Sequence, residues 1–96
     1  MEMRLIGRFH VKEGREADAE AALREVVVPT RTEAGCLEIH ALRSKSDPRL
    51  FFIHSRWRDE KSFEQHAAEP HTVRFVSLMQ TMIDHAWDTN RAEVIV

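Results

Sequence analysis

The chain has 96 residues, of which 43% are hydrophobic and 31% are charged, and its formal net charge is −2. This balance is typical of a globular domain, and it excludes a disordered chain. No basic cluster favours a nucleic-acid partner, and the longest apolar runs, of about four residues, are far shorter than the roughly 20 that span a membrane. The single cysteine, Cys36, excludes a disulfide framework. Because the start also lacks a secretory signal pattern, we expect one cytoplasmic domain over residues 1–96.

The first third of the chain reads as a strand followed by a helix. Residues 3–12 alternate with period two, and their apolar side includes Leu5 and Phe9. From about residue 15 to residue 32 the apolar residues recur at spacings of three and four, which predicts a helix. Pro29 should loosen its last turn, and Gly35 is a natural left-handed cap.

Two further strands are expected at Cys36–Arg43 and Leu50–Trp57, joined by the turn residues Lys45–Pro48. A turn centred near Asp47 places residues opposite each other when their numbers sum to about 94. The facing pairs are then Leu37–Trp57, Glu38–Arg56, His40–His54, Ala41–Ile53 and Leu42–Phe52. The register joins apolar partners and one pair of opposite charges, which supports it.

The rest of the chain predicts two helical segments and a strand. Asp59 is a suitable N-cap for a helix from Glu60 to about Ala68, and Pro70 fits the first turn of a second helix to about His85. A short strand at Arg91–Val96 would follow. The resulting βαββαβ order predicts a ferredoxin-like α+β fold with a four-stranded antiparallel sheet.

The two faces of this sheet should have different partners. The face toward the helices would carry Leu5, Phe9, Leu37, Ile39, Ile53 and Trp57. The opposite face would mix Ile6, Leu42 and Phe52 with Arg8, Glu38, His40, His54 and Arg56, and parity also assigns Cys36 to it. That face is too apolar for water and too polar for a monomer core, so we expect a homodimer joined through its sheet faces.

Several motifs along the chain now point to a family. The segments are EAGCL (33–37), Asp47-Pro48, Arg56-Trp57 with Asp59, and His66 followed by Pro70-His71. Together with their spacing they closely resemble the antibiotic biosynthesis monooxygenase family. The resemblance implies a dimeric α+β barrel with a pocket in each subunit between the sheet and the helices.

The same resemblance implies several chemistries. Some relatives are monooxygenases that oxidise phenols or quinols to quinones without a cofactor, and others degrade haem or isomerise a phosphorylated sugar. Trp57 matches the tryptophan that quinone-forming relatives use, whereas their asparagine, tyrosine and arginine are replaced here by Ile53, Phe63 and, in our best alignment, Val76. The haem-degrading pattern has Gly7, His66 and Val76 at its key positions here, which argues against haem.

His66 and His71 are the candidate catalytic histidines. A metal pair on one helix favours a spacing of four residues, whereas these are five apart across Pro70 with no evident third ligand, so we expect no metal. They could instead satisfy backbone groups at a helix junction, or one of them could act as a base. The positive end of the helix that starts at Pro70 disfavours a protonated His71.

Trp57 joins the two histidines in the expected catalytic group, as a platform on which a flat ring stacks. Trp57 could equally be an ordinary core residue. The expected substrate-binding residues are Ser55, which offers a hydroxyl, together with Phe63, Phe75 and Met79. The last three are spaced as core residues and would line a cavity if one exists.

The first functional hypothesis is a cofactor-independent monooxygenase that uses dioxygen to oxidise a small aromatic phenol or quinol. The substrate anion can itself reduce dioxygen, so the protein must supply an apolar pocket, a base and hydrogen-bond donors. Two alternatives stay open, namely an isomerase of a small phosphorylated metabolite and a non-catalytic ligand-binding or stress-response dimer. A phosphate-ready pocket would favour the isomerase, and a pocket filled by its own side chains would favour the non-catalytic dimer.

Overall fold

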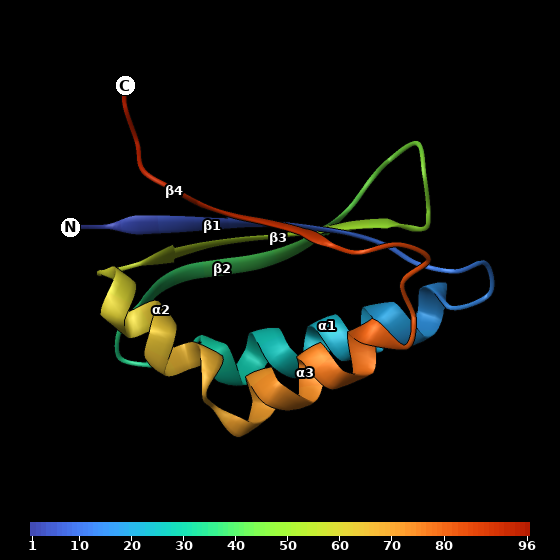
Figure 1. Cartoon of the computed structure of the whole chain (residues 1–96), viewed down its shortest axis with the longest axis horizontal. Coiled ribbons are helices and arrows are strands. Elements are labelled where there is room, and N and C mark those ends of the chain that lie inside the picture. The colour runs from blue at the N-terminus through green and yellow to red at the C-terminus, as the bar shows by residue number, and fades with distance from the viewer.

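A computed structural model describes all 96 residues, and it has the predicted ferredoxin-like α+β order (Figure 1). The elements are β1 (Met3–His10), α1 (Glu16–Thr30), β2 (Cys36–Arg43), β3 (Leu50–Trp57), α2 (Glu60–Ala67), α3 (Pro70–Gln80) and β4 (Asp88–Ala92). None of the helices combines the length and the apolar character needed to span a bilayer.

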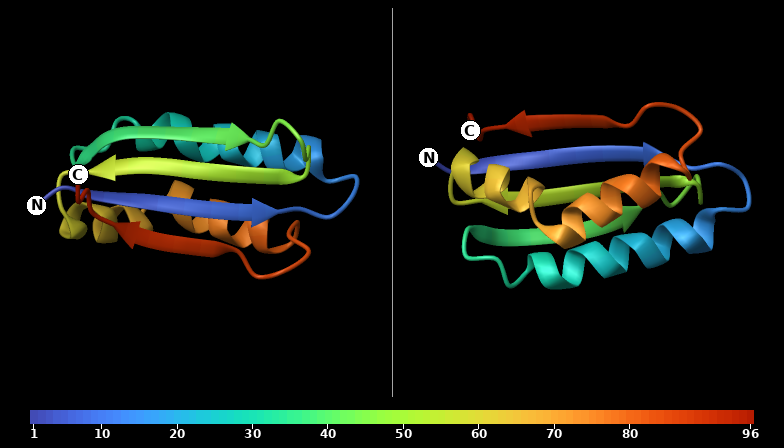
Figure 2. Two further views of the ribbon diagram at one scale, coloured as in Figure 1. Left: turned by 90° about the horizontal axis from the view of Figure 1, so that it is seen from above. Right: turned by 60° about the horizontal axis from the view of Figure 1, so that its bottom comes forward.

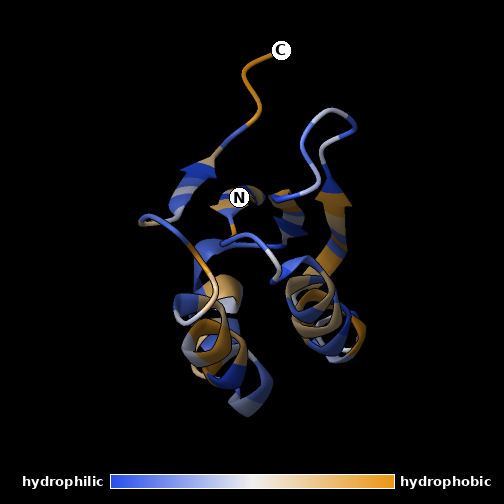
Figure 3. Ribbon diagram, turned by 90° about the vertical axis from the view of Figure 1, so that its right-hand side faces the viewer, coloured by the Kyte–Doolittle hydropathy of each residue, from blue (hydrophilic) through white to orange (hydrophobic).

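The four strands form one antiparallel sheet in the order β2-β3-β1-β4, and the helices cover only one of its faces (Figures 2 and 3). The strands alternate between buried and more exposed residues, so that Phe51, Ile53, Ser55 and Trp57 of β3 all point toward the helices. The core between the two layers comes from β1, β2, β3, α1 and α3. The open face of the sheet has no cover within the chain.

The predicted hairpin register is confirmed from Glu38 onward, including the pair His40–His54. The expected pairing of Leu37 with Trp57 is wrong, because Cys36 lies opposite Trp57 and the register shifts between Cys36 and Glu38. A β-bulge places one extra residue in a strand and reverses the faces beyond it. Leu37 is therefore 49% exposed, and Cys36 packs against the core rather than lying on the open face.

The C-terminal boundaries differ from the prediction. The second helix of the pair ends at Gln80 rather than at about His85, because the carbonyl of Met82 accepts from the N–H of Lys12 and the N–H of Asp84 donates to the carbonyl of His10. The last strand then occupies Asp88–Ala92 beside β1, and not 91–96. Residues 94–96, which the predicted strand included, are exposed and extend away from the sheet (Figure 3).

Gly35 has a different role from the one predicted. The only backbone with positive φ is at Gly14, where φ is 87°, so Gly35 is not a left-handed cap. Gly35 instead lies so close to α2 that a Cβ built on it would overlap with Cβ and Oγ of Ser62. The absence of a side chain at Gly35 therefore allows the α1–β2 loop to pack directly against α2.

The open sheet face carries the mixture expected of an interface. Ile6, in the middle of this face, is 46% exposed, and Leu42, on the edge strand β2, is 49% exposed. Beside them, Arg56 contacts Glu2 through Nε at 2.7 Å and Glu38 through Nη1 at 3.2 Å. Apolar residues flanked by paired charges favour burial against a second copy of the same face.

We therefore expect the chain to sediment as a dimer at micromolar concentration, and we expect Ile6→Glu to convert it to a monomer. The substitution places a charge in the centre of the proposed contact, where the second copy would strip it of water. Val73→Glu is the matched control, because Val73 is 55% exposed on α3, on the helical side of the molecule. A wild-type monomer, or a dimer that tolerates Ile6→Glu as well as Val73→Glu, would contradict this interface.

A polar cluster closes the end of the sheet where β1 stops. His10 lies between two carboxylates, with Nδ1 2.8 Å from Asp84 and Nε2 3.0 Å from Asp47. His85 also contacts Asp84, at 2.7 Å, and stacks on His10. Hydrogen bonds to Asp84 and then to Asp47 raise the pKa of His10. For Asp47, the backbone N–H of Arg49 and then the bond from His10 outweigh burial and lower the pKa.

The stabilisation from this cluster should fade as the pH rises. A group whose pKa is higher in the folded state stabilises the fold below its unfolded pKa and loses that effect as the pH passes the folded pKa. We expect wild type to lose a small part of its free energy of unfolding between about pH 6 and about pH 8.5 relative to His10→Gln. Urea unfolding at the two pH values measures this difference. Parallel pH profiles for the two proteins would show that His10 contributes nothing.

Candidate functional site

An apolar cavity of about 170 Å³ lies between the sheet and the helices α2 and α3. Its walls come mainly from apolar side chains that include Phe9, Ile53 and Phe75. The few polar groups that reach it include the hydroxyls of Ser55 and Thr72 and the imidazole of His66. A concave apolar space with a small number of polar groups is the usual form of a small-molecule site.

His66 connects this cavity to a partly buried carboxylate. The residue lies in the last turn of α2, which begins after the N-cap Asp59, and only 7% of it is exposed. Its Nδ1 lies 2.9 Å from Oε2 of Glu33, which comes from the loop between α1 and β2. The Oγ1 of Thr72 lies 3.2 Å from the same Nδ1. The carboxylate therefore fixes the orientation of the ring, as an acid–base histidine requires.

His71 approaches the same carboxylate from the start of α3. Its Nε2 lies 2.6 Å from Oε2 of Glu33, and the centroids of the His66 and His71 rings are 6.0 Å apart. One oxygen of Glu33 thus accepts from both imidazoles. The sequence argument for His71 considered only its own helix, whereas the structure adds this direct carboxylate partner.

Trp57 supports the site from behind the cavity. It is 1% exposed, and its ring centroid lies 4.7 Å from that of His66. Its Nε1–H donates to Oγ of Ser55 at 2.9 Å, and Phe63 packs edge-on against its ring. The indole therefore positions the polar groups of two cavity residues, Ser55 and His66.

The residues expected at the site divide into two groups. Four of them line the cavity, namely Ser55, Phe63, His66 and Phe75. The other three do not line it. Trp57 bonds to Ser55 from outside the lining, His71 shares Oε2 of Glu33 with His66, and Met79 is completely buried in the core. The roles of both groups in binding and catalysis stay predictions.

Sequence reasoning missed the role of Glu33. The residue was noted as part of a motif, but it lies 33 positions from His66 and 38 from His71 along the chain. Only the packing of its loop against α2 brings the three side chains together. The available signal was the Glu33-Ala34-Gly35 sequence itself, because a glycine that permits close approach commonly neighbours a site.

The argument against a metal rested on the five-residue spacing of the histidines and on the absence of a third ligand, and the structure supplies a third candidate ligand in Glu33. Each of Glu33, His66 and His71 offers a ligand atom within 4.8 Å of the other two. His10, Asp84 and His85 form a second such group at the other end of the sheet. Cys36 belongs to neither, and burial, with a smaller effect from Glu33, raises the pKa of its thiol, which keeps it protonated.

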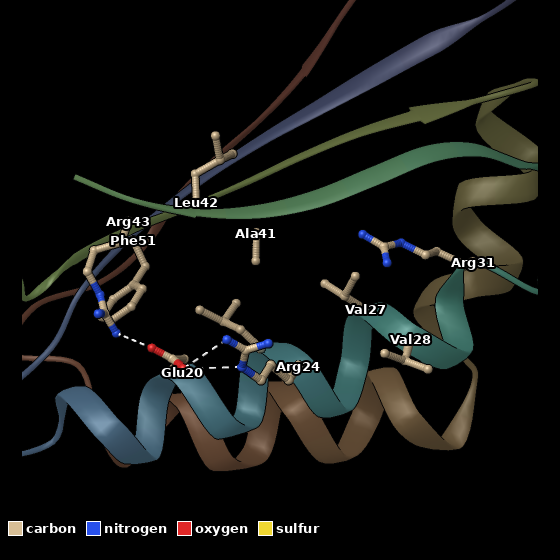
Figure 4. A pocket seen from close by; sticks show the side chains of 10 residues that line it. Glu20, Arg24, Val27, Val28, Arg31, Ala41, Leu42, Arg43 and Phe51 are labelled. Carbon is tan, nitrogen blue, oxygen red and sulfur yellow. Dashed lines mark hydrogen bonds and ion pairs between the residues drawn. The ribbon is translucent and has the colours of Figure 1, made fainter. Parts of the chain in front are cut away.

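A second hollow, of about 320 Å³, lies between α1 and the edge strand β2 (Figure 4). Arg24 and Arg43 both turn toward Glu20, which accepts from them at 3.1 and 2.6 Å. Arg31 is engaged with the backbone carbonyl of Ile39. The charged groups of this hollow are thus largely paired, and no histidine lines it, whereas His66 lines the first cavity.

Comparison with known proteins identifies the family. No curated protein matches the chain. Among solved structures, PA3566 from Pseudomonas aeruginosa is 26% identical, with a TM-score of 0.91 over 99% of this chain and 95% of the other. Rv0793 from Mycobacterium tuberculosis is 18% identical, with a TM-score of 0.94 over 100% and 97%. A structure described as an antibiotic biosynthesis monooxygenase is 22% identical, with a TM-score of 0.93 over 98% and 99%. Since residues 3–78 match the model of the antibiotic biosynthesis monooxygenase family, the chain belongs to that family.

Proposed function

We propose that this protein is a cofactor-independent monooxygenase that oxidises a small phenol or quinol with dioxygen. The observation that carries the proposal is the apolar cavity whose wall contains His66. Oε2 of Glu33 lies 2.9 Å from Nδ1 of this histidine. Such a pair can remove a proton from a bound hydroxyl group in a place that excludes most water.

His66 acts as the base in this proposal, and Glu33 and His71 are positioning residues. When Nδ1–H donates to Glu33, Nε2 is left as the proton acceptor. The phenol gives its proton to Nε2, and the phenolate supplies the electrons that reduce dioxygen. One oxygen atom enters the ring and the other leaves as water, so that a phenol plus dioxygen gives a quinone plus water.

The size of the cavity favours a single aromatic ring. An engineered apolar cavity of about 150 Å³ is known to hold benzene, and the cavity here has a volume of about 170 Å³. Phe63 and Phe75 on its walls provide edge and face contacts for such a ring. The hydroxyls of Ser55 and Thr72 could hold the second oxygen of a quinol.

Two features weigh against the alternatives. No lysine or arginine lines the cavity, so the phosphate of a phosphorylated metabolite would have no opposite charge there. The cavity is also not filled by its own side chains, as a purely structural core would be. Oxidation of an uncharged aromatic substrate therefore has the stronger support.

The proposal is tested by dioxygen consumption with a panel of phenols and quinols of increasing ring number. We expect one-ring substrates to be turned over, with one dioxygen consumed per quinone formed, and we expect substrates of three or more rings to be inert. Enlarging the cavity by Phe75→Ala should widen the range of accepted substrates, whereas Val73→Ala on the exposed side of α3 should not. Inactivity toward the whole panel, or equal rates for all ring sizes, would contradict the assignment.

A further inference from the structure

The side chains of Glu33, His66 and His71 are also arranged as a set of possible metal ligands. Two imidazole nitrogens and a carboxylate oxygen converge from three separate segments, namely the α1–β2 loop, α2 and the start of α3. Two histidines with one carboxylate are a ligand set that proteins use for zinc and for other first-row divalent cations. We propose that these three residues bind one Zn²⁺-like divalent cation.

The geometry requires only a small change to admit the ion. Nδ1 of His66 and Nε2 of His71 lie 2.9 and 2.6 Å from the same oxygen of Glu33. Ligands that sit about 2.0–2.1 Å from a tetrahedral zinc are about 3.3–3.5 Å from each other. Rotation of the Glu33 carboxylate provides this expansion, and its two oxygens already lie 2.9 and 3.2 Å from Nδ1 of His66.

Burial favours this cluster over the one at the other end of the sheet. The exposed fractions of the His66, Glu33 and His71 side chains are 9%, 15% and 21%. In the other cluster both nitrogens of His10 already have carboxylate partners, and the His85 side chain is 55% exposed. A metal there would be held by more exposed ligands, whose attraction for the ion is screened more strongly by water and salt.

The bound ion would oppose the reaction proposed above, and this consequence rests on that proposed function. A metal on Nδ1 of His66 leaves the proton on Nε2, so the ring can no longer accept the proton of a phenol. Zn²⁺ should therefore inhibit quinol oxidation, and excess chelator should restore it. The binding site itself does not depend on this activity.

Binding is measured first and without substrate. The 96-residue chain, stripped of metal by dialysis against a chelator, is titrated with Zn²⁺ in competition with a chromogenic chelator. We expect one Zn²⁺ per chain in wild type. Glu33→Gln and His71→Ala should weaken it by at least about 10- to 100-fold, a loss that is typical even of groups that only support a ligand. His85→Ala is the control and should bind as wild type does.

A second measurement uses only the wild-type chain, in case the variants fail to fold. Zn²⁺ should shift the imidazole NMR signals of His66 and His71 and leave those of His10 and His85 unchanged. The inference is overturned if wild type binds no Zn²⁺, if His85→Ala loses binding while Glu33→Gln retains it, or if the shifts occur at His10 and His85. Each of these outcomes can be read even if no quinol is ever turned over, so the metal site and the proposed oxidation can fail separately.

Discussion

Replacing His66 by glutamine should lower the rate of quinol oxidation by about 10²–10⁴-fold, the usual contribution of a positioned base. Glutamine keeps much of the volume beside Trp57 and can still donate to Glu33, but it cannot accept a proton at neutral pH. The loss should therefore appear mainly in kcat, with little change in KM. Steady-state dioxygen consumption with the best one-ring substrate measures both constants.

The matched comparison is a histidine outside the cavity. His85→Ala removes an exposed imidazole at the other end of the molecule and should leave the rate unchanged. His71→Ala removes a partner of Glu33 without touching the cavity wall, so we expect a smaller loss than for His66→Gln. If His66→Gln keeps the full rate on an active substrate, the base lies elsewhere and the histidines serve only to join the helices.

Adding one methyl group at Gly35 should lower the free energy of unfolding by about 1–3 kcal/mol, the usual cost of overpacking. A Cβ at this position would overlap with Cβ and Oγ of Ser62, and because Cβ is fixed by the backbone of α2, rotation of the hydroxyl cannot relieve the overlap. The α1–β2 loop and α2 would have to separate, which would also pull Glu33 away from His66. Urea unfolding of Gly35→Ala and wild type gives the difference.

A second substitution shows whether this contact is the cause. In a Ser62→Gly background the nearest remaining atom is Cα of residue 62, at 3.5 Å, which is an ordinary contact distance. Glycine within α2 carries its own cost of about 1 kcal/mol, so the comparison is between Ser62→Gly and the double variant. We expect Gly35→Ala to cost almost nothing in that pair. An equal cost in both backgrounds would place the strain in the Gly35 backbone instead.

The sheet was predictable from the sequence to the extent that its pattern is local. Alternation along β3 and the facing charges of Glu38 and Arg56 were enough for the hairpin register. The bulge at Leu37 could not be predicted, because it turns a single apolar residue outward and the alternation of the sequence does not show it. The predicted bounds of the last strand were wrong for a related reason, since the local sequence pattern does not show which segment pairs with β1.

The candidate site could be predicted only in part. The histidines and Ser55 stood out by residue type, and the pocket was expected from the family resemblance. Glu33 could not be placed, because its contact with His66 depends on how a loop packs against a helix more than 30 positions later. For Trp57, the alternation of the strand correctly predicted that the side chain points toward the helices. It could not predict that the ring is buried behind the cavity and does not form part of its wall.

The short helix α2 sets how often the site is fully assembled. It has eight residues, of which only Ser62 and His66 are buried, so α2 is held by these two side chains, by the contact of Phe63 with Trp57 and by its Asp59 cap. Segments of this kind open locally at a lower free energy than the sheet beneath them. Each such opening would separate His66 from Glu33 while the strands stay paired. The fraction of molecules competent for binding therefore follows the amide-exchange protection of residues 60–67, not the global stability of the fold.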